Sequence, residues 1–257
     1  MDRRSSCAVA LLGLMLLVRP AWAAGLTRAD VTEALARASP EHKADFAGQS
    51  LEKADLSGLD LAGVDFAGAD LRNANLSDAN LSGANLRGAL MDLAWIMRTN
   101  FTGADLSGAS LRAMVTSTGM EASVKEAANF SHAILAGARI IARLSFANLR
   151  FANFAGADMG VELRNQSMGL LRTELSDCEM EGADLAGANL KYALLRFSKL
   201  HGADLRGAVL INADLSGADL TGADLAGADR TGADFDGAVL AGAKGLGPPP
   251  ASPSRLP

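Results

Sequence analysis

The side chains that most often carry out chemistry are few and scattered in this sequence. The histidines His42, His132 and His201 lie far apart, and none has a second ligand at a metal-binding spacing. The sequence also lacks the H-E-x-x-H motif of metalloproteases, the glycine-rich phosphate loop and the G-x-S-x-G motif of serine hydrolases. We therefore expect no catalytic site, no metal and no cofactor, and the protein is not expected to be an enzyme.

Aspartates are the one chemically active residue type that recurs with a regular spacing. Two rows repeat at intervals of 20 residues: Asp184, Asp204 and Asp224, and Asp45, Asp65, Asn85 and Asp105. A column of carboxylates could bind cations or imitate the phosphates of DNA. The same aspartates also fill one fixed position of a repeated sequence, so we favour the interpretation that they are solvated structural residues.

The sequence around these side chains repeats with a period of five residues. In residues 183–242, taken in fives, the first residue is Ala in 11 of 12 repeats, the third is Leu or Phe in 11, and the fifth is Gly in nine. Neither an amphipathic helix nor an alternating strand gives this period. The same spacing runs upstream from Phe46 to Leu111 and again from Phe130 to Met159, with one single-residue slip after Ile140.

These repeats resemble the pentapeptide-repeat family, whose consensus is A-(D/N)-L-x-x. The resemblance covers residues 44–242 and implies an all-β fold, a right-handed quadrilateral β-helix in which four repeats complete one square coil. Ala and Leu then point inward, and Gly near the corner accepts a positive φ at little steric cost. Stacked coils of this kind bury their core through their neighbours and need closed ends.

The N-terminal residues have the layout of a secretory signal peptide. Arg3 and Arg4 precede an apolar run at residues 7–18, and Ala21-Trp22-Ala23 forms a cleavage site, so residues 1–23 are expected to be cut off after Ala23. An uncleaved anchor is the less favoured alternative, because the run is shorter than the roughly 20 residues of a membrane span. The mature chain is therefore expected to have no membrane span and to be periplasmic or secreted.

The mature chain loses three arginines and one aspartate, which changes its formal net charge from −5 to −7. A negative chain does not favour nucleic acid as a partner. It retains one cysteine, Cys178, in the position usually held by Ala, so we expect a buried thiol and no internal disulfide.

Both ends of the repeat region differ from its middle. Residues 24–43 are expected to hold a short capping helix, because Thr27 and Asp30 resemble a capping box and Val31, Ala34 and Leu35 share one helical face. Residues 243–257 are rich in Pro, Gly and Ser and predict a disordered tail. Arg230 stands in a central inward position, where a buried charge is costly, so the last coils are expected to be distorted or partly open.

The repeat pattern is interrupted twice. Residues 112–129 predict an irregular insertion, and the register is broken at residues 160–174. Trp95 stands at a normally polar, outward position one coil below the first insertion. We favour the interpretation that the insertion covers Trp95 over the alternative that Trp95 is part of an exposed docking patch.

Aromatic residues replace the usual Gly at three repeat ends, Phe151, Tyr192 and Phe197. If the second break keeps one repeat near residue 165, Phe151 and Tyr192 share a face with Arg172 between them, and Phe197 lies on the adjoining side. Aromatic residues and Arg are enriched at binding hot spots, although local packing is the favoured interpretation. Together with Trp95, these residues are the candidate partner contacts.

The sequence thus favours a non-enzymatic periplasmic β-helical scaffold that binds a protein partner, whose identity and pathway the sequence does not give. The alternative is a DNA-mimicking pentapeptide protein that binds DNA gyrase. Family members of that kind act in the cytoplasm, whereas the leader predicts export. The resemblance to the family does not decide between the two, because fold and function are only loosely linked.

Overall fold

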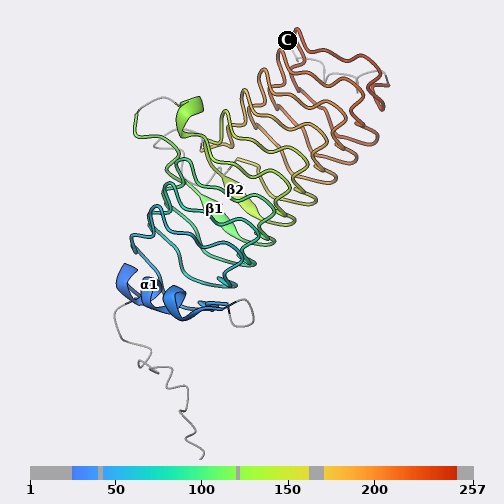
Figure 1. Cartoon of the computed structure of the whole chain (residues 1–257). Coiled ribbons are helices and arrows are strands. Elements are labelled where there is room, and N and C mark those ends of the chain that lie inside the picture. Colours follow the sequence, from blue (N-terminus) through green and yellow to red (C-terminus); the bar gives the residue numbers. More distant parts are fainter. Residues whose placement is uncertain (1–24, 40–42, 120–121, 162–170, 248–257) are drawn as a thin grey trace, which may run out of the picture.

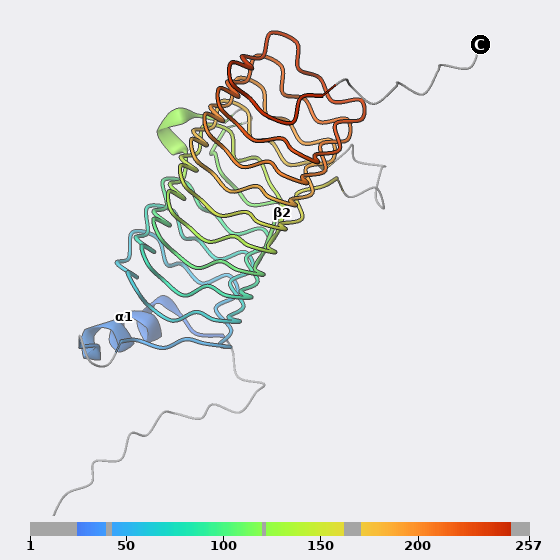
Figure 2. The same cartoon turned by 90° about the vertical axis from the view of Figure 1, so that its right-hand side faces the viewer.

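The chain folds into a rod of stacked square coils with a short helix at one end (Figure 1). The computed structural model describes residues 25–39, 43–119, 122–161 and 171–247. The view turned by 90° shows the same stack from the side, with α1 (Arg28–Arg37) again at its base (Figure 2). The predicted signal peptide at residues 1–23 lies outside the described residues.

Parallel backbone bridges between neighbouring coils set the register of the rod. Residues 20 apart are paired over most of its length, as in Asp45 with Asp65 and Asp204 with Asp224. Each side of a coil is five residues long, and within the described residues the bridges trace nine coils. We name the sides A, B, C and D; in coil 1 they are centred on Phe46, Leu51, Leu56 and Leu61.

The narrow interior is filled by the first and third residues of each repeat. Leu71, Leu76 and Leu81 are fully buried, and the preceding Ala69, Ala74 and Ala79 are buried beside them. The N–H of most central residues donates to the coil above, for example from Leu71 to Leu90 O at 2.8 Å. When one coil stacks on another, it therefore buries the apolar side chains and also completes the backbone hydrogen bonds between the two coils.

The corner after most central residues has a positive φ. Gly187, for instance, has φ +65°, a conformation that Gly adopts freely. Where the corner residue is not Gly, the strained conformation is retained: Phe151, Tyr192 and Phe197 have φ values of 56°, 61° and 55°. These aromatic side chains are consequently fixed to backbone corners and point away from the core.

Helix α1 closes the N-terminal end of the rod, as predicted. The capping box is present, with the Thr27 N–H donating to Asp30 Oδ2 at 2.8 Å, and Val31 is fully buried against coil 1. The Leu26 N–H donates to Ser50 O at 2.7 Å, and Arg28 Nη1 donates to the carbonyl oxygens of Asp55 and Ser57 at 3.2 and 2.8 Å. These hydrogen bonds attach the start of the helix to the backbone carbonyl groups of coil 1.

The first interruption is narrower than the predicted 112–129. Strand β1 (Ser110–Arg112) pairs in parallel with β2 (Arg139–Ile141), and Val115 still pairs with Trp95, so the coil is intact up to there. The extra residues leave the rod between Val115 and Asn129 and include the 3-10 helix η1 (Val124–Glu126). The chain rejoins the register where the Arg98 N–H donates to Glu126 O.

The second interruption lies between Val161 and Thr173, inside the predicted 160–174. Asp158 pairs with Arg139, and the N–H groups of Met159 and Val161 still donate to Asn189 O and Lys191 O, while Glu174 pairs with Arg143. Residues 162–170 lie outside the described residues. Thr173 marks the return: its hydroxyl is fully buried and donates to Ile140 O and Met159 O at 2.8 and 2.9 Å.

The ladder extends beyond residue 242, where the repeats were expected to end. Lys244 pairs with Asp224, and Ala243 and Leu246 pack against the core. Residues 243–247 thus belong to the fold, whereas residues 248–257 of the predicted tail lie outside the described residues.

Candidate interaction surface

Phe151 and Phe197 lie at opposite edges of side D in the middle of the rod. Phe151 occupies the corner after side D of coil 5, and Phe197 the corner before side D of coil 7. Both rings are exposed, with 57% and 63% of their surface accessible. Phe197 was expected on a side adjoining that of Phe151, and the bridges place the two rings on either side of one face.

Each ring contacts a neighbouring coil. The Phe151 ring stacks on His132 in the coil below, with ring centroids 5.1 Å apart and an angle of 18° between the planes. On its other side it covers Gly182, where an added Cβ would lie 2.7 Å from two ring carbons. Phe197 covers Gly217 in the same way. Local packing therefore fixes both rings, while each keeps an exposed surface.

Charged side chains fill the strip between the two rings. Arg150 Nε lies 3.3 Å from Glu179 Oε2 and 2.7 Å from Glu181 Oε2, and Lys199 Nζ lies 3.1 Å from Glu179 Oε1. His201 follows in the same column as Glu181 and helps to lower the pKa of Asp219, whose main cause is the hydrogen bond from Thr221. We call this strip the side D surface, comprising His132, Arg150, Phe151, Glu179, Glu181, Phe197, Lys199 and His201.

The predicted grouping of Phe151, Arg172 and Tyr192 on one face is wrong. Across the second interruption the paired residues are 31 apart instead of the usual 20, so the Phe151 N–H donates to Glu181 O and Phe151 is level with Gly182. Arg172 is level with Tyr192, because Glu174 pairs with Leu194. These two residues lie on the corner between sides B and C, half a coil away from Phe151.

The expectation that the first insertion covers Trp95 is also wrong. Trp95 is 45% exposed on side C, because the inserted loop returns beside Arg98, at the next corner. Leu90 and Leu93 in the same coil are 41% and 47% exposed. Leu93 was missed in the sequence, although it is a bulky residue at a corner with φ 63°, which is the signal that could have identified it.

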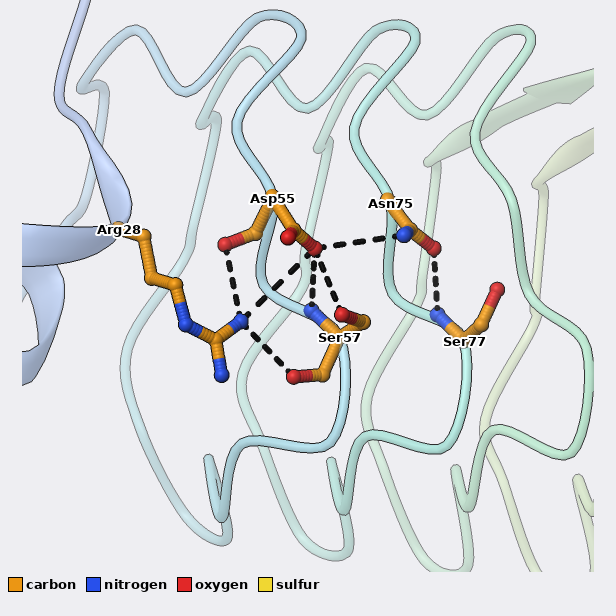
Figure 3. A network of polar contacts seen from close by, with 5 residues as sticks. All are labelled: Arg28, Asp55, Ser57, Asn75 and Ser77. Atoms are coloured by element: carbon orange, nitrogen blue, oxygen red, sulfur yellow. Dashed lines mark hydrogen bonds and ion pairs between the residues drawn. The ribbon is translucent and has the colours of Figure 1, made fainter.

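Aspartates at the second repeat position have a structural role, as Figure 3 shows for Asp55. In the two rows, Asp45, Asp65 and Asp204 each accept a hydrogen bond from the backbone N–H two residues further on. Asp55 Oδ1 accepts hydrogen bonds from the Ser57 N–H at 3.1 Å and the Ser57 hydroxyl at 2.7 Å, and Asn75 Nδ2 of the next coil lies at 3.3 Å. The Ser57 hydroxyl is the main cause that lowers the pKa of Asp55. These carboxylates therefore close turns and link coils, which leaves few lone pairs for a cation.

Two features of the described residues could be considered for chemistry, a hollow beside the first insertion and the thiol of Cys178. A hollow of about 160 Å³ beside the first insertion is lined by Val115, Ser117 and Arg143. The guanidinium of Arg143 forms an ion pair with Glu174, with Nε 3.0 Å from its carboxylate.

Cys178 is fully buried, and burial raises the pKa of its thiol. Its Sγ lies 3.0 Å from Leu144 O. No group of His, Cys, Asp and Glu in this part could hold a metal ion, and no helix in it could cross a membrane.

The family model "Pentapeptide repeats" matches in eight copies, at residues 42–78, 74–112, 170–207, 188–225 and 203–242. These matches cover more than half of the chain, which therefore belongs to the pentapeptide-repeat family and folds as a right-handed quadrilateral β-helix. Proteins of this family generally act as structural or interaction scaffolds.

Solved pentapeptide-repeat proteins are similar to this chain. HetL of the cyanobacterium Nostoc sp. strain PCC 7120, involved in heterocyst differentiation regulation, is 29% identical over 85% of this chain and 94% of its own, with a TM-score of 0.48. QnrB1, a plasmid-mediated fluoroquinolone resistance protein, is 21% identical over 76% and 88%, with a TM-score of 0.40. A thylakoid-lumen protein of Arabidopsis thaliana is 29% identical over 51% and 67%, with a TM-score of 0.23. No curated protein matches the sequence.

Proposed function

We propose that this protein is a non-enzymatic scaffold that binds a protein partner through the side D surface. The observation that carries the proposal is the pair of exposed rings, Phe151 and Phe197, held at both edges of a charged strip. Rings fixed by packing lose little conformational entropy on binding, and aromatic residues dominate the energy of many interfaces. The charges between them are balanced in sign, which suits a protein surface better than a nucleic acid.

The proposal places the scaffold in the periplasm or outside the cell. Its support is the predicted leader at residues 1–23, with its two arginines, its apolar run and its cleavage site.

Photo-crosslinking in living cells tests the proposed surface. A photoreactive amino acid at Lys199 is expected to capture a discrete partner, and Phe151→Ala combined with Phe197→Ala is expected to reduce the captured band at least tenfold. Val239→Ala, an exposed apolar change on side D of coil 9, is the matched control and should leave the band unchanged. Equal capture by the double variant and the wild type would contradict the proposed surface.

A melting temperature measured on the same variants separates binding from stability. Tyr192→Ala, on a different corner, should also leave capture unchanged. If the double variant loses capture only in proportion to a lowered melting temperature, the rings have a structural role and the proposal fails.

A reporter fusion tests the location and the gyrase alternative together. Reporter activity confined to the cytoplasm would remove the export part of the proposal and favour a DNA-mimicking gyrase-binding protein. The structure offers that alternative little support, because the aspartates that would imitate phosphates close turns, as Asp55 does with Ser57. Reporter activity in the periplasm would exclude gyrase as the partner.

A further inference from the structure

The charges on side D form one layer for each coil. Bridges pair Glu179 with Lys199 and Lys199 with Asp219, which places these three residues above one another in coils 6, 7 and 8. In a second column beside them, backbone hydrogen bonds stack Arg150, Glu181, His201 and Thr221 in coils 5 to 8. The sign of the charge therefore alternates along the rod: positive in coil 5, negative in coil 6, positive in coil 7 and negative in coil 8.

This alternation has two defined ends, because the matching positions of side D are uncharged in coils 4 and 9. These positions are held by Asn129, Ser131, Val239 and Ala241. The four charged layers span three coil spacings, or about 14 Å at the usual strand separation. The exposed rings of Phe151 and Phe197 lie on the two edges of this short charged strip.

The charged side chains in the middle of the strip form ion pairs with one another, and each remains accessible. The exposed fractions are 40% for Arg150, 36% for Glu179, 32% for Glu181 and 54% for Lys199. Ion pairs at a protein surface contribute little to stability, so a partner's charges can share them at small cost. A partner that carries the opposite alternation would be held in one register by these layers.

The spacing of the layers selects the secondary structure of such a partner. Side chains on one face of an extended strand are about 6.7 Å apart, so over three intervals they overshoot the layers by about 6 Å. Residues one turn apart in an α-helix are about 5.4 Å apart, and over the same distance they overshoot by only about 2 Å. Long acidic and basic side chains can absorb that difference, so a helix along the rod matches the layers and a strand does not.

We propose that the side D surface binds an α-helix of a protein partner, which lies along the rod and presents acidic and basic side chains in alternation at intervals of one turn. This inference rests on the proposed function, because it specifies the partner of the same surface. Acidic residues of the helix face Arg150 and Lys199, and its basic residues face Glu181 and Asp219. Since the layers alternate regularly, the helix can run in either direction.

Charges and rings have different roles in this complex. Displacing the helix by one coil would bring like charges together, so the layers fix its position along the rod. Phe151 and Phe197 contact apolar residues on the two flanks of the helix, because the rings lie at opposite edges of side D. The surface thus accepts a helix whose charged row has an apolar residue on each side.

Two synthetic peptides test the alternation. Both are helical, have the same composition and carry Leu on both flanks of the charged row. The alternating peptide has Glu, Lys, Glu and Lys at intervals of one turn, whereas the blocked peptide has Glu, Glu, Lys and Lys. By fluorescence anisotropy, the wild type is expected to bind the alternating peptide at least tenfold more tightly. Equal affinity for the two peptides, or binding of neither, would overturn the inference.

A rearranged variant should exchange this preference. Glu179→Gln, Glu181→Lys and Lys199→Glu together give two positive layers in coils 5 and 6 and two negative layers in coils 7 and 8. This variant is expected to bind the blocked peptide at least tenfold more tightly than the alternating one, a gain that a folding defect cannot produce. Asp78→Arg with Arg98→Asp exchanges an ion pair on a corner of coils 2 and 3 and is the matched control, which should keep the wild-type preference.

Capture in living cells separates this inference from the proposed function. A photoreactive amino acid at Ala241, exposed on side D of coil 9, is expected to capture the partner in the wild type and at least tenfold less of it in the rearranged variant. If Phe151→Ala with Phe197→Ala abolishes capture while the rearranged variant retains it, the inference fails and the proposed function holds. If the double variant of the two rings retains capture, the proposed function fails and the inference fails with it.

Discussion

Single residues at the corners of the rod decide which side chains reach the surface in a fixed orientation. A Gly at a corner accepts the positive φ, and it also leaves room for an aromatic ring from the coil below. Gly182 does both, since it has φ +63° and lies under the Phe151 ring. Gly187, one repeat further on, has φ +65° with open space around it.

This pair of glycines gives a residue-scale prediction. Gly187→Ala is expected to cost about 1–2 kcal/mol of unfolding free energy, because Ala strains at positive φ. Gly182→Ala should cost more, since its Cβ also displaces the Phe151 ring from its stack on His132. Chemical denaturation measures both. The excess cost of Gly182→Ala should disappear in a Phe151→Ala background; an excess that persists there would show that the ring is not its cause.

The next scale is the coil, the element that repeats. Neighbouring coils are joined by the backbone ladder inside and by ion pairs outside. Arg98 holds Asp78 of the coil below through two contacts, Nε to Oδ1 at 2.6 Å and Nη2 to Oδ2 at 2.7 Å. This hydrogen bonding is the main cause that lowers the pKa of Asp78. Such pairs couple the stability of the coils to pH.

The direction of that coupling can be predicted. Because the pKa of Asp78 is lower in the folded than in the unfolded chain, its contribution is complete above the unfolded value of about 3.9 and is lost as pH falls through the folded value. Asp78→Asn should therefore flatten the decline of unfolding free energy between about pH 5 and 2. In an Arg98→Gln background the same change should have little effect on that decline, and an undiminished effect would contradict the assignment.

The coil is also the scale at which sequence-based prediction succeeds and then fails. Inward positions such as Leu76 could be predicted, because the five-residue period alone identifies which residues of each repeat point into the core. The position of Phe151 relative to Tyr192 could not, because it depends on where the pairing resumes after Val161. Trp95 was misplaced for the same reason: the sequence shows that a loop is inserted, and only its return beside Arg98 shows which corner it covers.

At the scale of the whole molecule, α1 covers the N-terminal end of the rod, and Phe235 and Leu240 at the other end of the described residues are only partly buried. Its coils contact only their neighbours, so stability is the sum of local terms and the ends need not open together with the middle.

Native-state hydrogen exchange should reveal this asymmetry. Amides in the middle of the rod, such as Leu149, are expected to exchange slowest. The Leu240 amide should exchange fastest, and that of Leu56 beneath α1 should be intermediate. Thr27→Ala, which removes the capping box and costs about 1 kcal/mol of helix stability, should speed exchange in coil 1 and leave coil 9 unchanged. Equal exchange at both ends would contradict the closing role of α1.

The cap at the N-terminal end also sets an order for assembly. Helix α1 and coil 1 are the first described elements to leave the ribosome or a secretion channel, and they present a finished edge before the next repeat has appeared. Each later coil can then form on the one below it as soon as its four sides are available. No part of the ladder has to wait for a distant segment, so the rod can fold in the direction in which it is synthesised.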